Sequence, residues 1–287
     1  MSGLVSARTT TVLAEGFRFP EGPRWHDGRL HFSDQHDRRV LAVDAVGEVE
    51  TIVDVPQCPS GLGWLPDGRM LVVSMHDRKL LRLDPDGLTE VADLSQHATW
   101  HCNDMVVDAV GRAYVGNFGF DLDAGGVVPV AAVIVRVDPD GTVSIAADEI
   151  RFPNGTVITP DGATLIVGES YGGCLTAFDV GADGGLSNRR VWAKLDGAVP
   201  DGICLDAEGA VWSACPLTGR VLRVLEGGEV TDEVTVTRKG AYACMLGGRD
   251  GTTLFVCAAD ASNPEHTGDR RGTIETCEVA IPHAGLP

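Results

Sequence analysis

The stretch NGTVITPDGATLIVG, residues 154–168, decides the fold, because five other stretches of the chain repeat its pattern. Each begins at a polar residue or a cysteine, continues as a short apolar run, turns at a glycine and resumes as a second apolar run. The others are EGPRWHDGRLHFSD from Glu21, SGLGWLPDGRMLVVS from Ser60, NDMVVDAVGRAYVGN from Asn103, DGICLDAEGAVWSAC from Asp201 and CMLGGRDGTTLFVCA from Cys244. Successive starts lie 39 to 51 residues apart. A period of about 40–50 residues built from short strands is typical of β-propellers, so the sequence predicts an all-β, six-bladed β-propeller.

One repeat has the pattern of a four-stranded blade. In the fourth repeat, the apolar runs 154–158 and 164–169 flank the turn Pro160-Asp161-Gly162. Proline presets φ in such a turn and glycine accepts a positive φ, which favours a hairpin. The runs 174–179 and 190–194 supply the third and fourth strands. No segment shows an apolar stripe with a 3.6-residue period, so helix content is predicted to be very low.

The whole chain, residues 1–287, is predicted to form a single propeller domain. The repeats run from about residue 20 to about residue 280 with no linker between them. The segment TTTVL, Thr9–Leu13, precedes the first repeat, and we expect it to complete the last blade as a strand.

Composition and charge exclude several kinds of partner. With 44% hydrophobic and 22% charged residues, the chain has the composition of an ordinary globular protein. A net charge of −18 argues against binding to nucleic acid or to anionic membranes. The first residues show no secretory signal, and the apolar stretch 125–137 is too short to span a bilayer. None of the eight cysteines forms a C-x-x-C pair, so we expect reduced, buried thiols in a cytoplasmic protein.

The first residue of each repeat carries the candidate chemistry, because the innermost strands of a propeller ring the mouth of its channel. These residues are Glu21, Ser60, Asn103, Asn154, Asp201 and, with an offset in the last repeat, Cys244. Carboxylates and amides that converge on one axis are costly to bury unless a cation offsets them. Oxygen ligands favour Ca²⁺ first and then Mg²⁺ or Mn²⁺, with Zn²⁺ as an alternative. For any single Asn-Gly or Asp-Gly pair, a simple tight turn is the other interpretation.

Four separated motifs carry a resemblance to a known family. They are E-G-P-x-W at Glu21–Trp25, N-D followed by D-x-x-G-R within 103–112, N-G at Asn154–Gly155 and P-D-G at Pro200–Gly202. In this order, over nearly the whole chain, the sequence resembles the SMP-30/gluconolactonase/luciferin-regenerating enzyme family. The resemblance implies a six-bladed propeller that holds one divalent metal ion and hydrolyses lactones.

The resemblance also implies roles for single residues. It implies that the metal ligands are Glu21, Asn154 and Asp201 and that Asn103 contacts the substrate. Asp201 matches the residue that serves as general base. On this basis the sequence predicts hydrolysis of a small-molecule lactone by metal-activated water, with no serine nucleophile. Two alternatives stay open: a metal-binding propeller that changes a specialised metabolite without hydrolysis, and a non-catalytic metal-binding or interaction protein.

Two departures from the family pattern fall where the substrate should lie. Many sugar lactonases of the family have arginine two residues before the N-D asparagine, whereas this chain has His101. The family's common W-F-G-T-M is replaced within residues 113–120, which include Phe118. His101 and Phe118 are therefore predicted to contact a lactone that is less hydroxylated or more apolar than a sugar lactone. A hydrogen-bonding role behind the site for His101 and a packing role for Phe118 are the alternatives.

The segment Asp121–Val130 lengthens the third repeat to 51 residues. Long glycine-containing insertions between blade strands often form lids or pocket walls. We therefore expect either a pocket lid or a plain connection here. The sequence leaves the oligomeric state open.

Overall fold

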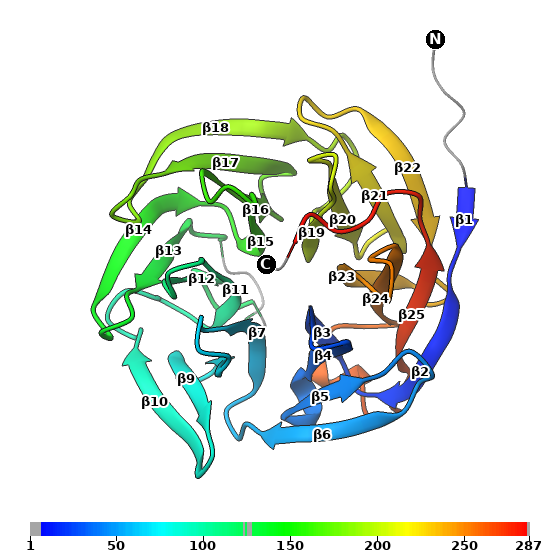
Figure 1. Cartoon of the computed structure of the whole chain (residues 1–287), viewed down its shortest axis with the longest axis horizontal. Helices are drawn as coiled ribbons and strands as arrows, with labels where there is room; N and C mark the ends of the chain where they lie inside the picture. The colour runs from blue at the N-terminus through cyan, green and yellow to red at the C-terminus, as the bar shows by residue number, and fades with distance from the viewer. Residues whose placement is uncertain (1–6, 123, 125–127, 286–287) are drawn as a thin grey trace.

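The predicted six-bladed β-propeller is confirmed by a computed structural model of the chain, which describes residues 7–122, 124 and 128–285. Six small sheets surround a central channel, and two short 3-10 helices complete the described structure (Figure 1). Within four of the sheets the strands run antiparallel in chain order from the channel outward, and each of the other two adds a strand from the start of the described chain at its outer edge. The short strands and glycine turns of each repeat therefore correspond to one blade.

The first three blades contain twelve strands. Blade one has β3 (Pro20–His26), β4 (Arg29–Asp34), β5 (Arg39–Val43) and β6 (Val49–Asp54). Blade two has β7 (Pro59–Trp64), β8 (Met70–Ser74), β9 (Lys79–Asp84) and β10 (Gly87–Asp93). Blade three has β11 (Cys102–Val107), β12 (Ala113–Asn117), β13 (Ala132–Val137) and β14 (Val143–Ile150).

The other three blades include both strands from the start of the described chain. Blade four has β15 (Pro153–Ile158), β16 (Thr164–Glu169), β17 (Cys174–Val180) and β18 (Leu186–Lys194). Blade five has β19 (Ile203–Leu205), β20 (Val211–Cys215), β21 (Arg220–Val224), β22 (Val230–Thr235) and β1 (Ala7–Thr9). Blade six has β23 (Gly240–Gly247), β24 (Thr253–Ala259), β25 (Gly272–Glu278) and β2 (Thr11–Phe17).

The segment Thr9–Leu13 divides between two blades. Thr9 ends β1, which pairs in parallel with β22, and Thr11 begins β2, which pairs antiparallel with β25. Between the two strands, the Thr10 hydroxyl donates a hydrogen bond to the carboxylate of Glu275 in β25. The start of the described chain thus joins the fifth blade to the sixth (Figure 1).

Glycines after the first residue of a repeat allow neighbouring inner strands to touch. A Cβ atom added at Gly155 would lie 2.3 Å from the backbone nitrogen of Ile203 in the next blade. One added at Gly202 would lie 2.4 Å from the Cβ of Ala243. Any larger residue would therefore push the blades apart. The Asn-Gly and Asp-Gly pairs are sites of close backbone approach between blades, which simple turn formation does not account for.

A register shift accompanies these contacts in the inner strands. It occurs after Pro153 in β15 and after Cys102 in β11, so Asn154 and Asn103 lie within irregular stretches of ladder. Such bulges re-aim side chains out of the regular alternation of a strand. They explain how polar residues at the start of mostly apolar strands reach the channel.

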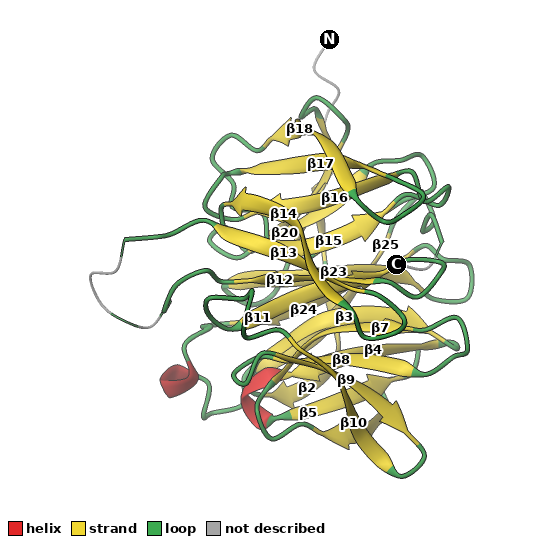
Figure 2. Ribbon diagram, turned by 90° about the vertical axis from the view of Figure 1, so that its left-hand side faces the viewer, coloured by secondary structure: helices red, strands yellow, loops and turns green. Residues whose placement is uncertain are grey.

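The two faces of the propeller differ. The 3-10 helices η1 (Gln35–Asp37) and η2 (Pro264–His266) lie at the same face (Figure 2). At the other face the segment 282–284 packs over blades five and six, where Ala284 donates its N–H to the carbonyl of Leu205. Neither helix of the described structure has the length and apolar character needed to cross a membrane.

Candidate functional site

A cavity of about 890 Å³ opens at the channel mouth on the face that carries η1 and η2. All six side chains predicted for the site line this cavity: Glu21, His101, Asn103, Phe118, Asn154 and Asp201. They come from blades one, three, four and five, and they meet only because the propeller closes. Asp121–Val130, predicted as a lid or a connection, includes residues 123 and 125–127, which lie outside the described residues, while Leu122 lines the cavity.

Two members of the predicted ring do not line the cavity. Ser60 is buried behind Asn103, and its hydroxyl donates to the Asn103 Oδ1 at 3.4 Å. Placing Cys244 in the ring is wrong, because its thiol is buried in β23 against the carbonyl of Trp212 at 3.4 Å. Tyr242 lines the cavity from blade six instead. The strand shifts register between residues 241 and 243, and spacing from the glycine turn does not reveal such a bulge.

Glu21 and Asp201 are the two carboxylates at the floor of the cavity. Burial raises the pKa of Glu21 from 4.5 to about 8, against a hydrogen bond from the Gly22 N–H at 2.9 Å. The pKa of Asp201 is raised well above its usual value by burial and then by the charge of Glu21, while Asn154 and Gly202 act in the opposite direction. Each carboxylate therefore makes the other more costly to ionise.

The residues present fit a hard divalent cation. Two facing carboxylates in a low-dielectric site are stabilised by a positive charge between them. The Asn154 Nδ2 donates to the Ser170 hydroxyl at 3.2 Å, and that hydroxyl donates to the Pro200 carbonyl at 2.7 Å. Because the Asn154 Nδ2 is hydrogen-bonded to Ser170, the amide is oriented with its Oδ1 available for a ligand. Among residues of the described ranges, no cluster of three or more His, Cys, Asp or Glu side chains is arranged to hold a metal, so any cation here needs the amide oxygen.

An ion pair lies behind the floor of the cavity. The Arg24 guanidinium donates to the Asp104 carboxylate at 2.8 Å and to the Met105 carbonyl at 2.6 Å, and both charged residues are buried. The charge of Asp104 raises the pKa of both Glu21 and Asp201. Arg24 lines a second cavity, of about 470 Å³, so the pair lies between the two openings of the channel. No local sequence signal marks this pairing, since 80 residues separate its members.

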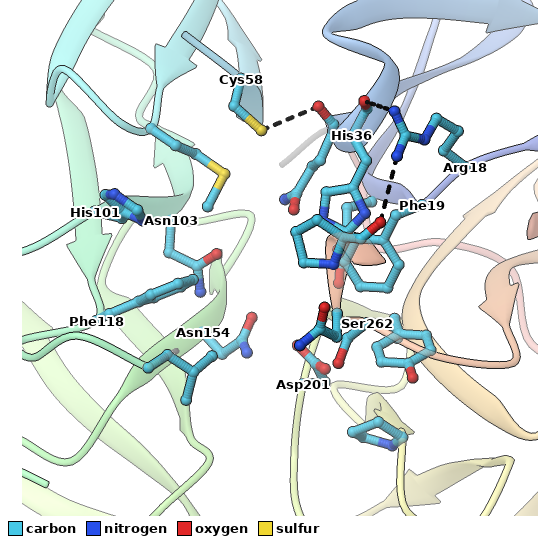
Figure 3. Close-up of a pocket in the computed structure, with 18 of the residues that line it drawn as sticks. Arg18, Phe19, His36, Cys58, His101, Asn103, Phe118, Asn154, Asp201 and Ser262 are labelled. Carbon is cyan, nitrogen blue, oxygen red and sulfur yellow. Dashed lines mark hydrogen bonds between the residues drawn. The ribbon is translucent and has the colours of Figure 1, made fainter. Parts of the chain in front are cut away.

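Aromatic rings form the wall that blades two to four contribute. His101 lies between Trp100, stacked at a centroid distance of 4.9 Å, and His76, at 4.4 Å. Phe118 stacks on Phe152 at 4.7 Å. Figure 3 shows His101 and Phe118 on the same side of the cavity as Asn103 and Asn154. This wall of the cavity is therefore rich in aromatic rings that pack on one another.

The facing wall comes from blades one and six. Phe19 stacks on His36 at 4.9 Å and meets Tyr242 edge-on at 4.8 Å. Burial, with the nearby charge of Arg18, lowers the pKa of His36 to about 4, so its ring is neutral near pH 7. Arg18, His36 and Phe19 lie opposite the aromatic wall in Figure 3. Sequence analysis had identified none of these residues as part of the site.

The fold and the site together define a six-bladed propeller with an oxygen-rich site at one channel mouth. Residues 19–260 match the model of the SMP-30/gluconolactonase/LRE-like region, and the chain belongs to this family. The resemblance found in the sequence motifs is thereby confirmed.

The relatives of the chain include proteins named as regucalcin and a protein named as a lactonase. It is 32% identical to regucalcin of Danio rerio over 176 residues, which cover 60% of this chain and 59% of that relative. It is 29% identical to 6-deoxy-6-sulfogluconolactonase of Pseudomonas putida over 277 residues, or 92% of this chain and 89% of that protein. In structure it matches regucalcin of Agrobacterium tumefaciens, described as a calcium-binding protein, with a TM-score of 0.81, 22% identity and 99% of both chains covered. This last similarity shows the fold.

Proposed function

We propose that the protein is a metal-dependent lactonase that hydrolyses a cyclic ester. The observation that supports this proposal is the meeting of two carboxylates with raised pKa values and two amides at the floor of one large cavity. Membership of a family with a relative named as a sugar lactonase supports the same reaction class. The reaction would add water across the ring ester bond and release a hydroxy acid.

Glu21, Asn154 and Asp201 are the residues that would hold the cation. When bound, a divalent cation would polarise the lactone carbonyl and lower the pKa of a nearby water molecule. Calcium is the ion we favour, because the donors are carboxylate and amide oxygens. The description of the Agrobacterium relative as a calcium-binding protein supports the choice of calcium.

Asp201 would act as the general base. Its carboxylate accepts a proton from the attacking water as the water oxygen bonds to the carbonyl carbon. One N–H of the Asn103 amide is engaged by the Pro153 carbonyl at 3.3 Å, and the second can donate to the developing oxyanion. The ring C–O bond then breaks, and Asp201 or His101 returns the proton to the leaving oxygen. Burial of Asp201 suits this role, because a carboxylate freed from water is a stronger base.

The walls favour a lactone with few hydroxyl groups. The polar side chains of the cavity are largely engaged by the protein itself: Gln35 Nε2 donates to the Ser60 hydroxyl at 3.2 Å, and His36 Nδ1 pairs with Thr267 at 2.9 Å. A sugar lactone would bring hydroxyl groups that lose their hydrogen bonds to water on binding and therefore need hydrogen-bond partners in the cavity. An alkylated or ring-fused lactone would instead bury its surface against Phe118 and Phe152.

A lactone panel with controlled metal tests the proposal. Protein stripped by a chelator is assayed with a pH indicator on sugar lactones and on plain and alkylated γ- and δ-lactones. Calcium, magnesium, manganese or zinc is then restored singly. We expect acid release that depends on one added metal and is fastest with the less hydroxylated lactones. Silence across the panel, together with metal binding shown by calorimetry, would favour a non-hydrolytic reaction or a binding protein.

A further inference from the structure

We infer that the cavity contains an anion-recognition subsite at its rim, formed by Arg18 and Arg38, and that the substrate is a lactone carrying a carboxylate or sulfonate group. The identification of the substrate as a lactone rests on the proposed lactonase function. The anion subsite itself does not depend on that function. Both arginines line the cavity: Arg18 lies in the segment between β2 and β3, and Arg38 lies between η1 and β5 of the blade that contributes Glu21.

The two arginines lack the partners that other arginines of this protein have. The sequence contains 41 acidic and 23 basic residues, so carboxylates are in excess. Most arginines in the described ranges form an ion pair, whereas Arg18 and Arg38 form none with a described carboxylate. In such an acidic protein, two cations without carboxylate partners beside one cavity indicate a place for an external anion.

Arg18 is fixed in position without being neutralised. Its backbone N–H donates to both carboxylate oxygens of Asp34 at 3.1 Å. Its guanidinium donates to the carbonyls of His36 at 3.0 Å and Pro264 at 3.3 Å. Two terminal nitrogens thus use one N–H each, and each retains another for a ligand. Carbonyl groups orient the fork, but they leave its full positive charge in place.

Arg38 adds a second cation beside the same helix. It follows η1 directly and has a left-handed backbone with φ of 59°, and its N–H donates to the Gln35 carbonyl at 3.0 Å. In the described part of the chain its side chain makes no hydrogen bond. Arg18 contacts the same helix through His36. The helix η1 therefore brings both cations to one part of the rim.

The other charges of the cavity do not cancel these two. Asp37 lines the cavity, but it pairs with Arg39 and with Arg270, the latter at 2.6 Å. Glu21 and Asp201 lie at the floor, where a cation would offset them. The aromatic wall on the opposite side includes Phe118 (Figure 3), which stacks on Phe152. An elongated ligand would thus place its lactone ring at the floor and its acid at the rim.

A homologous series of γ-lactones tests the subsite. Each member carries a carboxylate on the ring or on a chain of one to three methylene groups, and each is compared with its neutral carboxamide. We expect at least one carboxylate to exceed its amide by about 10- to 100-fold in kcat/KM, through KM, as loss of a charged hydrogen bond predicts. Arg18→Gln should bring the ratio close to one, and Arg38→Gln should reduce it.

A control and a second readout separate the two proposals. Arg249→Gln makes the same change of charge at an exposed arginine outside the cavity, and it should leave the ratio unchanged. Calorimetry with the corresponding γ-lactams measures the same preference without hydrolysis, with circular dichroism confirming that each variant is folded. Preference for lactam carboxylates that is lost in Arg18→Gln, with no lactone hydrolysed, would retain the subsite and refute the lactonase. A series without any preference for carboxylates would overturn the subsite. A preference that survives both substitutions and disappears with chelator would assign recognition to the cation and overturn it as well.

Discussion

Two regions of this molecule bury carboxylates, and they treat them in opposite ways. In blade six, Glu275 is fully buried and accepts hydrogen bonds from the Thr237 N–H at 2.8 Å and from the hydroxyls of Thr237 at 2.6 Å and Thr273 at 2.9 Å. The hydroxyl of Thr10 is a further donor. The fold thus supplies every partner that this carboxylate needs.

At the floor of the cavity, the protein leaves the carboxylates incomplete. Among the described residues, the one hydrogen bond to the Glu21 carboxylate comes from the adjacent Gly22, and Asp201 lies beside it with its pKa raised. Placing two such groups together costs folding energy unless something else binds. The comparison shows that hydrogen-bond satisfaction, more than burial, separates a structural carboxylate from one held ready for a ligand.

The largest effect is expected for Asp201→Asn. Removal of the general base should lower kcat for the best lactone by about 100- to 10,000-fold. The variant should remain folded, because the change also removes the repulsion between Asp201 and Glu21. Steady-state kinetics and thermal unfolding of the metal-free protein measure the two effects. Asp86→Asn, at an exposed turn, is the matched control. Near-full activity of Asp201→Asn would remove this residue from the mechanism.

Glu275→Gln is the corresponding test of the structural carboxylate. The amide group of glutamine would face the fixed Thr237 N–H or lose one hydroxyl partner, so the free energy of unfolding should fall by about 2–3 kcal/mol. Turnover per folded molecule should stay unchanged, because Glu275 lies outside the cavity. Urea unfolding compared with Glu226→Gln, an exposed glutamate, provides the measurement. Equal stability of the two variants would show that the hydrogen bonds to Glu275 are not important for the fold.

The repeat pattern made most of this architecture predictable. The strand expected at 164–169 is found at those residues, because alternating apolar runs and glycine turns are local signals. The fourth strand of blade four begins at Leu186, before the expected 190, since its outer positions are exposed and polar. Polar edge strands lack the apolar pattern on which the prediction depends.

The site was predictable only where a motif marks it. Asn154 and Asp201 occupy equivalent places in their repeats, and the structure brings both to the cavity. Tyr242 was missed because a bulge changes the register of β23 without altering its apolar pattern. Arg18 was missed for a different reason: it lies ahead of the first repeat, and its place in the rim depends on carbonyls of His36 and Pro264. Such contacts across the ring have no sequence signal.

A histidine outside the cavity allows the pH dependence of stability to be tested for a buried group that has no role in the proposed site. His31 is buried in β4, and burial, followed by the charges of His26 and Arg29, lowers its pKa from 6.5 to about 4. The unfolded chain therefore binds a proton between these values that the folded protein does not. The contribution of His31 to stability should be complete above pH 6.5 and should be lost as the pH decreases towards 4. His36 acts in the same direction.

The variant His31→Gln should show a weaker loss of stability over this range, by about 1–2 kcal/mol. Urea unfolding at pH 7, 6, 5 and 4 measures it, with His266→Gln, at an exposed position, as the control. The difference should be the same with calcium or with chelator, because His31 does not line the cavity that holds the proposed metal ligands. Identical pH profiles of wild type and His31→Gln would contradict a depressed pKa for this residue.

The smallest effect is expected where the protein only orients a ligand. Ser170 accepts a hydrogen bond from the Asn154 amide and donates to the Pro200 carbonyl, so it fixes which end of the amide faces the cavity. In Ser170→Ala the amide can rotate, and cation affinity should fall by about 3- to 10-fold, at or below the lower end of effects seen for outer-shell partners. Calcium calorimetry on Ser170→Ala and on Ser187→Ala, exposed in the same blade, makes the comparison. Loss confined to Ser170→Ala would show that the floor combines an unsatisfied pair of carboxylates with an amide that is already oriented. Equal affinities would mean that cation binding alone orients the Asn154 amide. Only Glu21 and Asp201 would then be in position before the cation binds.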